Sequence, residues 1–355
     1  MRKGAQEPAF LGAMRRTGFE LELLAPRGKA RRDLAEALAA KLGAGTRIEY
    51  GLKYHSDAIH ASRRPVCHLT PAYRIRTSDG RVLATIVDDN TINKDLDADA
   101  PDQPELFRFV VDDLRIAIWL ERHSWTHAWG LDTIFAQLTK TFDGTVLPRG
   151  VHPAQHPEHR VVIDPVGHAL GVVALYGGER ERVSEIVTAP LWPYEREAVL
   201  DLLLETAAGL GFACPHEAAL HLHLDRQPWM NTGSLKRLIL GFSEARTSIL
   251  ETLSPNPACT KLGPFSARTI EAAGSSASMN FDAFCKLLRA TGATKYADIN
   301  ILGLINEPPL HPTLEVRCLP MSMEAARIEA LTREVERFLT EIEGEGAGTA
   351  AEPGA

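Results

Sequence analysis

The chain is 355 residues long, 45% of its residues are hydrophobic and 24% are charged, and its net charge is −7. This composition is ordinary for a folded globular protein. The negative charge argues against a broad nucleic-acid-binding surface, which would have to be basic. The five cysteines form no CxxC pair, and no stretch reaches the roughly 18 uninterrupted apolar residues of a membrane span. We therefore expect a cytoplasmic protein that binds neither nucleic acid nor membrane.

The two ends of the chain lack the apolar residues that packing against a core requires. We predict a flexible N-terminus at residues 1–14 and a disordered tail, rich in Gly, Ala and Glu, at residues 344–355. Between them we expect a single domain over residues 15–343, which is long enough to bury a substantial core.

The predicted elements follow one another in irregular order. A period-two pattern at 18–26 predicts a strand, and a helical pattern at 30–43 ends at Gly43. One hairpin is predicted at 71–89, turning at Ser78, Asp79 and Gly80, and another at 161–177, turning near Gly167. Further strands are predicted at 184–191, 296–304 and 313–320, and further helices at 194–211, 234–253, 281–292 and 323–343.

This order indicates the fold class. Parallel strands need long crossover connections, so doubly wound and barrel folds alternate strand and helix regularly. The chain shows no such rhythm and no internal repeat. We therefore predict an α+β fold with a mostly antiparallel sheet flanked by helices.

Four of the predicted strands carry charged or metal-binding side chains among apolar neighbours. In LHLHLDRQ, His221, His223 and Asp225 occupy every second position, so they project from one face of the strand and the leucines from the other. The other polar positions of this kind are Glu20 and Glu22 in GFELEL, Glu185 in SEIVTAPL, and Glu315 and Arg317 in TLEVRCLP.

Carboxylates gathered on a sheet face repel one another and lose hydration unless cations neutralise them. Oxygen-rich sites with a few imidazoles suit Mg²⁺ or Mn²⁺, which commonly bridge to phosphate oxygens. The four rows together predict a metal site. For any one row alone, the alternative is a solvated outer face of the sheet.

In their order along the chain, GFELEL, SEIVTAPL, LHLHLD and TLEVRCLP resemble the motifs of the putative amidoligase family. That family is a branch of the glutamine synthetase and glutamate-cysteine ligase group of carboxylate-amine ligases. The resemblance covers about residues 18–320, with a looser match over 45–160. It implies a curved, mostly antiparallel sheet like that of the glutamine synthetase catalytic domain, holding Mg²⁺ ions that clamp ATP. It also implies that a carboxylate, from a small molecule or a peptide, is joined to an amine through an acyl phosphate.

The resemblance implies metal-binding roles for four carboxylates. Glu20 and Glu22 fall on the paired carboxylates of the family's first strand, which hold Mg²⁺. Glu185 and Glu315 fall on two further metal carboxylates.

It also implies residues that contact ATP. One of His221 and His223 falls on a histidine near the ATP phosphate and the metal. We favour His221, because the first histidine of the family's H-x-H pattern is usually the constant one. Arg317 falls on an arginine expected to face phosphate or the acyl phosphate. Arg317 and His221 are therefore the expected catalytic residues, and Asp225 is a candidate general base whose alternative is a turn carboxylate.

A basic segment surrounds the start of the first predicted helix. It holds Arg27, Lys29, Arg31 and Arg32, although the exposed N–H groups and dipole of a helix N-terminus already favour anions. Arg27 and Lys29 are expected to contact an anion such as ATP or a carboxylate substrate, and the alternative is a solvated basic loop. No Walker motif occurs, so ATP would not be held by a P-loop.

Two other classes of function stay open. Metal-dependent hydrolases also use HLH pairs, with zinc or a metal pair that activates water. A non-catalytic binding protein that keeps the ligase fold is the other class. Dependence on Mg²⁺ and ATP would distinguish ligation from hydrolysis at a tightly bound zinc.

Overall fold

A computed structural model of the protein describes most of the chain. The described residues are 15–26, 29–55, 67–88, 107–111, 119, 122–123, 131–143, 145–149, 159–163, 172–176, 183–276, 279–309 and 311–344. The chain divides into two compact units, one comprising Met1–Glu20, Pro190–Asp201 and Ala219–Ala355, the other Leu21–Ala189 and Leu202–Ala218. Helices and antiparallel strand pairs occur in both units, which confirms the α+β class. That residues 15–343 form a single domain stays a prediction, and so does the likeness of the sheet to that of the glutamine synthetase catalytic domain.

The first unit contains the strands that were predicted to carry the histidine and Glu315 rows. β10 (Ala219–Asp225) pairs antiparallel with β12 (Thr313–Pro320), and β12 pairs antiparallel with the short β11 (Ile299–Asn300). β1 (Thr17–Leu24) is the next neighbour of β10 and has residues in both units. The leucines of β10 are almost completely buried, as the alternating pattern requires.

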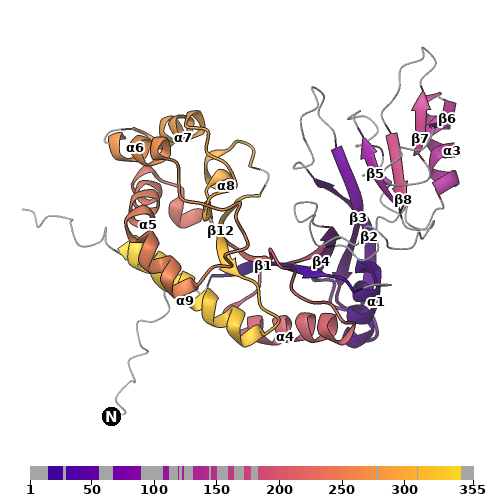
Figure 1. Ribbon diagram of the computed structural model, residues 1–355, viewed down its shortest axis with the longest axis horizontal. Coiled ribbons are helices and arrows are strands. Elements are labelled where there is room, and N and C mark those ends of the chain that lie inside the picture. The colour runs from indigo at the N-terminus through magenta and orange to yellow at the C-terminus, as the bar shows by residue number, and fades with distance from the viewer. Residues whose placement is uncertain are drawn as a thin grey trace, which may run out of the picture. The chain divides into compact units, whose positions relative to one another are not determined.

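Helices cover the strands of the first unit, and α5 packs along α9 (Figure 1). Asn231, Ser266 and Asn280 cap three of these helices by accepting a hydrogen bond from a backbone N–H. Phe242 of α5 and Phe338 of α9 are buried against each other, with ring centroids 6.2 Å apart. The helices are α5 (Thr232–Leu253), α6 (Ala267–Ser275), α7 (Phe281–Ala290), α8 (Leu302–Ile305) and α9 (Ala325–Gly344), with a 3-10 turn η3 (Gln227–Trp229).

The strand predicted over 296–304 is wrong for most of its length. Only Ile299 and Asn300 pair as a strand, and the helical turn α8 follows at once. The Asn300 side chain accepts a hydrogen bond from the backbone N–H of Leu302, which turns the chain away from the extended conformation. The helix α6 was not predicted.

In the second unit, the first predicted helix and hairpin are confirmed. α1 (Arg31–Leu42) ends at Gly43, whose φ of 84° suits glycine. β3 (Cys67–Arg76) and β4 (Val82–Asp88) pair antiparallel, and Gly80 turns between them with φ of 86°. The turn is closed by hydrogen bonds from Gly80 N to Thr77 O and from Thr77 N to Arg81 O.

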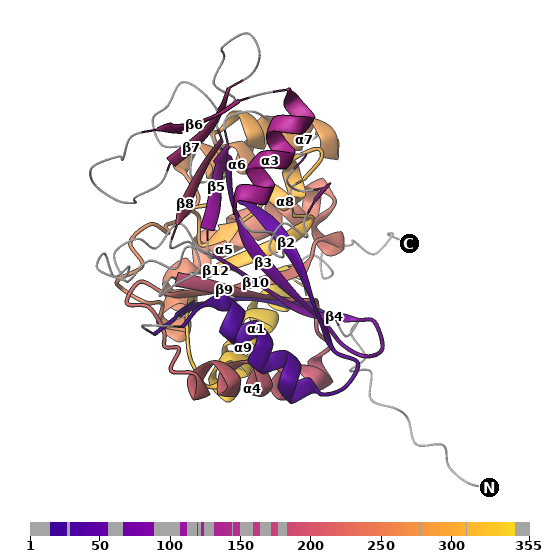
Figure 2. The ribbon, with the colours of Figure 1, turned by 90° about the vertical axis from the view of Figure 1, so that its right-hand side faces the viewer.

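Four further strands of the second unit, β2, β5, β8 and β9, extend this hairpin into a larger sheet (Figure 2). β2 pairs with β3 from His68 to Arg76, so β4 and β5 share the other edge of β3. The order along the sheet is β9-β4-β3-β5-β8, and β6 and β7 form a separate pair. The bounds are β2 (Arg47–His55), β5 (Phe107–Val111), α3 (Leu131–Phe142), β6 (Thr145–Arg149), β7 (His159–Ile163), β8 (Val172–Tyr176) and β9 (Val183–Thr188); α4 (Pro193–Gly209) has residues in both units.

The hairpin predicted at 161–177 is wrong in its pairing. Both strands exist, but β7 pairs with β6, and β8 pairs with β5. The predicted turn at Gly167 lies outside the described residues. Alternation of apolar residues indicates that a segment is a strand, whereas the strand with which it pairs depends on distant segments of the chain.

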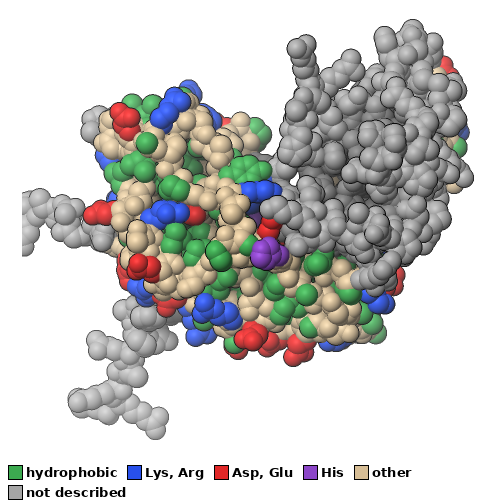
Figure 3. Space-filling view, viewed as in Figure 1, with side chains coloured by type: hydrophobic (Ala, Val, Ile, Leu, Met, Phe, Trp, Pro, Cys, Tyr) green, Lys and Arg blue, Asp and Glu red, His purple; other side chains and the backbone are tan. Residues whose placement is uncertain are grey.

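The surface and the helices add two observations. On the face shown in Figure 3, Lys and Arg side chains are interspersed with Asp and Glu side chains over the described residues. No helix within the described part of the chain is long and apolar enough to cross a membrane.

Candidate metal centre

Two histidines of β10 hold one carboxylate of β1. Because β10 is extended, His221 and His223 project from the same face while the leucines beside them enter the core. The Nδ1 atom of His221 is 2.8 Å from Glu20 Oε2, and the Nε2 atom of His223 is 2.8 Å from Glu20 Oε1. Each oxygen of Glu20 therefore has its own imidazole partner, and all three residues belong to the first unit.

The pairing of β10 with β12 adds a second carboxylate. Glu315 is directly opposite His223 in this antiparallel ladder, and opposite residues have Cβ atoms about 5 Å apart. The Oε1 atom of Glu315 lies 3.7 Å from His221 Nδ1 and 4.0 Å from His223 Nε2. Glu315 is 7% exposed, so its charge is largely removed from water.

A bulge in β12 follows Glu315. While β10 advances from Leu220 to Leu222, β12 passes from Leu319 to Val316, so β12 contains one extra residue. Bulges bend a strand and redirect the side chains next to them. Arg317 lies within this bulge, and its Nη1 atom donates a hydrogen bond to Glu315 Oε1. The predicted row of Glu315 and Arg317 is therefore an ion pair.

Burial and charge together set the ionisation of the cluster. Burial raises the pKa of Glu20, but hydrogen bonds from His221 and His223 outweigh it and hold this pKa well below its ordinary value. Burial also raises the pKa of Glu315, whereas the charges of Arg317 and His221 bring it below the ordinary value. Burial lowers the pKa of His223, but the hydrogen bond and charge of Glu20 raise it overall. Near neutral pH, two ionised carboxylates thus lie beside two imidazoles and the cation of Arg317.

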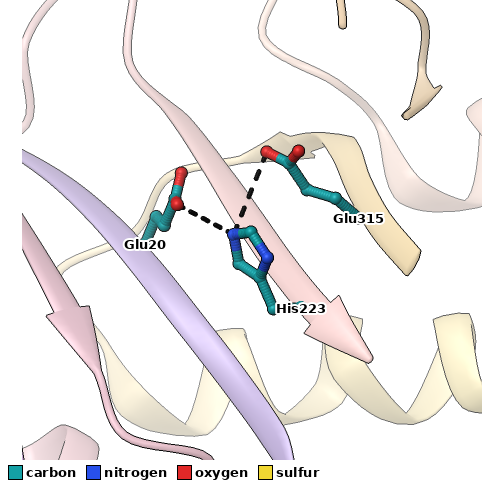
Figure 4. Close-up of side chains that lie close together, drawn as sticks. All are labelled: Glu20, His223 and Glu315. Atoms are coloured by element: carbon teal, nitrogen blue, oxygen red, sulfur yellow. Dashed lines mark hydrogen bonds and ion pairs between the residues drawn. The ribbon is translucent and has the colours of Figure 1, made fainter. Parts of the chain in front are cut away.

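Glu20, His223 and Glu315 fit a divalent cation (Figure 4). Each offers one ligand atom, and these atoms lie within 4.8 Å of one another. Carboxylate oxygens suit Mg²⁺ and Mn²⁺, and an imidazole also suits transition metals. The Nδ1 atom of His223 is 2.8 Å from Thr313 Oγ1, which leaves Nε2 directed at the carboxylates. A partner on the second ring nitrogen is the usual arrangement for a histidine that binds a metal.

One family of known proteins matches most of the chain. The family model described as "Putative amidoligase enzyme" matches residues 13–336, which include β1, β10 and β12. The chain belongs to the amidoligase family. The resemblance of its motifs to that family is thereby confirmed, and the family assignment makes the chain an enzyme of the ligase type. Neither the curated proteins nor the solved structures gave a match.

Two polar residues that contact the metal group were missed by sequence reasoning. The side-chain amide of Asn300 donates a hydrogen bond to Glu315 Oε2 at 2.6 Å, and Thr313 contacts His223 as described above. The ring of His311 is also close to His223, at 6.2 Å between centroids. A single Asn or Thr has no periodic pattern, so only the pairing of β12 with its neighbours reveals these contacts.

The other predicted site residues belong to the second unit, to a turn, or to a part of the chain outside the described residues. Glu22 is buried on β1 and Glu185 is half-buried on β9, both in the second unit, and their role as metal ligands stays a prediction. Lys29, also in the second unit, forms an ion pair with Asp33 at 3.4 Å. Arg27 lies outside the described residues. Asp225 is exposed and accepts a hydrogen bond from the backbone N–H of Gln227, as a turn carboxylate does.

Proposed function

We propose that the protein is an ATP- and Mg²⁺-dependent ligase that joins the carboxylate of a small molecule or peptide to an amine through an acyl phosphate. The observation that carries this proposal is the convergence of Glu20, His223 and Glu315, with Arg317 beside them. Membership of the amidoligase family supports it. Mn²⁺ is a second candidate ion, since one of the three ligands is an imidazole.

The proposed reaction has two steps. A carboxylate oxygen of the substrate attacks the γ-phosphorus of ATP, and the bond from that phosphorus to the β–γ bridging oxygen breaks, which releases ADP. The amine nitrogen then attacks the acyl carbon, the carbon–oxygen bond to the phosphoryl group breaks, and the proton that the nitrogen loses ends on the departing phosphate. Phosphorylation is needed because an unmodified carboxylate has no good leaving group.

The described residues have distinct tasks in this scheme. Glu20, His223 and Glu315 would hold the cation, which when bound supplies positive charge to the phosphate oxygens. His221 fixes the second oxygen of Glu20 and so limits rotation of that carboxylate. Arg317 is held by Glu315 and presents a cation to an anionic ligand, as transfer of a charged phosphoryl group requires.

Release of ADP tests the proposal. The purified protein is incubated with Mg²⁺ and ATP and with pools of amino acids, polyamines and short peptides, and ADP is measured. We expect at least one pool to stimulate ADP release and Glu315→Gln to abolish the stimulation. Glu324→Gln, which makes the same change at an exposed position before α9, is the matched control and should be fully active. If no pool stimulates release and calorimetry detects no binding of Mg²⁺ and ATP, ligation is refuted.

A metal-dependent hydrolase is the second candidate, because His223 brings an imidazole to the metal group and imidazole suits zinc. Metal analysis of the protein after dialysis distinguishes the two. Tightly retained zinc, with hydrolysis of amides or phosphoesters in the absence of ATP, would favour the hydrolase. Readily exchanged Mg²⁺ or Mn²⁺, with ADP release, favours the ligase.

A further inference from the structure

Glu315 has a polar neighbour on each side of its strand. On β10 it is opposite His223, and on β11 it is opposite Asn300. We propose that Asn300 is a positioning residue, which fixes the carboxylate of Glu315 in the orientation that a cation at the site needs. This role rests on the metal centre of the proposed function and extends it to a residue outside the ligand group.

The side chain of Asn300 is held at both ends. Its Nδ2 atom donates to Glu315 Oε2 at 2.6 Å, and its Oδ1 atom accepts from the backbone N–H of Leu302 at 2.9 Å. A backbone N–H can only donate, so the oxygen of the amide must face Leu302 and the nitrogen must face Glu315. The amide therefore cannot turn without losing both hydrogen bonds.

This contact makes the two oxygens of Glu315 different. Asn300 holds Oε2, while Oε1 is the oxygen that lies near His221, His223 and Arg317. The terminal torsion of a glutamate has a broad energy minimum, so a carboxylate without such a partner rotates easily. Asn300 thus keeps Oε1 directed at the histidines.

The backbone that carries Asn300 is itself anchored, although β11 is only two residues long. Asp298, the residue before β11, donates its backbone N–H to Gly263 O, and its carbonyl oxygen accepts a hydrogen bond from Arg317 N, each at 2.8 Å. The carboxylate of Asp298 is buried and accepts from Arg246 Nε of α5 at 2.7 Å. Tertiary hydrogen bonds therefore fix the position from which Asn300 reaches Glu315.

The test must separate the contact with Glu315 from the contact with Leu302. Asn300→Ala removes both hydrogen bonds. Asn300→Ser removes the donor to Glu315 but keeps an oxygen that can accept from Leu302 N–H, as serine does in local turns. Asn280→Ala is the matched control, because Asn280 also accepts a backbone hydrogen bond, at the start of α7, but lies outside the strands that carry the metal group.

Binding of Mn²⁺ to the nucleotide-free protein is measured by electron paramagnetic resonance of the free ion. We expect Asn300→Ala and Asn300→Ser to weaken binding about 10- to 100-fold, the range found when a partner of a metal ligand is lost. Asn280→Ala should bind as the wild type does. Thermal unfolding in EDTA shows whether each variant is folded, and Asn300→Ser should unfold near the wild-type temperature.

Each outcome bears on one of the two proposals. Wild-type affinity in folded Asn300→Ser, together with loss of binding in Glu315→Gln, would overturn the role of Asn300 while leaving the metal centre intact. Absence of Mn²⁺ binding in the wild type, or full binding in Glu315→Gln, would overturn the metal centre itself. Weaker binding in both Asn300 variants and unchanged binding in Asn280→Ala supports the positioning role.

Discussion

Arg196 of α4 is a buried cation whose loss should strongly destabilise the first unit. Its side chain is 2% exposed and lies against α9, where Nη1 is 2.6 Å from Glu336 Oε1 and Nε is 3.1 Å from Glu329 Oε2. It also donates from Nη1 to Thr17 Oγ1 at 3.3 Å. Arg196→Met keeps most of the side-chain volume and removes the charge.

The exposures of the two partners set the magnitude. Glu336 is 34% exposed and can turn toward water, but Glu329 is only 6% exposed and would keep a buried negative charge. Removing one member of a buried ion pair costs about 3–5 kcal/mol. Arg333 still contacts Glu329 at 3.0 Å, and because it is 69% exposed it compensates weakly. We therefore expect a loss of about 3 kcal/mol in the free energy of unfolding.

Urea unfolding followed by circular dichroism measures this loss. The double variant Arg196→Met with Glu329→Leu removes the stranded charge and should recover most of the stability. Arg337→Met is the control, because Arg337 also pairs with two glutamates of α9 but is 55% exposed, and its loss should change stability little. An Arg196→Met protein within about 0.5 kcal/mol of the wild type, or a double variant no more stable than the single one, would refute the reasoning.

Three further predictions concern the strands of the site and their surroundings. Gly303→Ala would place a Cβ atom against the backbone of Thr313, so urea unfolding should show that the free energy of unfolding falls by about 2 kcal/mol or more. The control is Gly274→Ala, in open space within α6, which should raise the free energy of unfolding by about 0.5–1 kcal/mol. Equal effects of the two substitutions would contradict the close approach at Gly303. Thr313→Val removes the hydroxyl beside His223 and should weaken Mn²⁺ binding about 10-fold, and unchanged affinity would show that this contact does not orient the ring. Burial raises the pKa of the Cys318 thiol to about 12, so iodoacetamide at pH 8 should modify Cys318 only in the unfolded protein, and mass spectrometry of the native protein would detect any exception.

Elements with a strong periodic pattern were predicted well. The strand at 313–320 and the helices at 234–253 and 281–292 agree with β12, α5 and α7, because their side chains alternate or repeat as those structures require. The errors lie where the local pattern is compatible with two structures. The apolar stretch at 296–304 suited a strand, but the side chain of Asn300 bonds to Leu302 N–H and a helical turn follows.

The candidate site, like the fold, was predicted correctly in part. Alternation along LHLHLD was enough to place His221 and His223 on one face, and GFELEL and TLEVRCLP supplied their carboxylates. We favoured His221 as the site histidine, and the group whose ligand atoms converge contains His223, while His221 contacts the other oxygen of Glu20. Spacing within one strand does not distinguish two histidines that share a face.

What the sequence by itself determined is the type of the strongly periodic strands and helices, which of their faces carry polar groups, and which family the motifs belong to. Only the tertiary structure decided that Glu315 is opposite both His223 and Asn300, and that a bulge follows it at Arg317. The physical reason is that periodicity depends on local backbone geometry, whereas pairing and register depend on residues far apart in the chain. Asn300 and Thr313 acquire their roles at the site from that register.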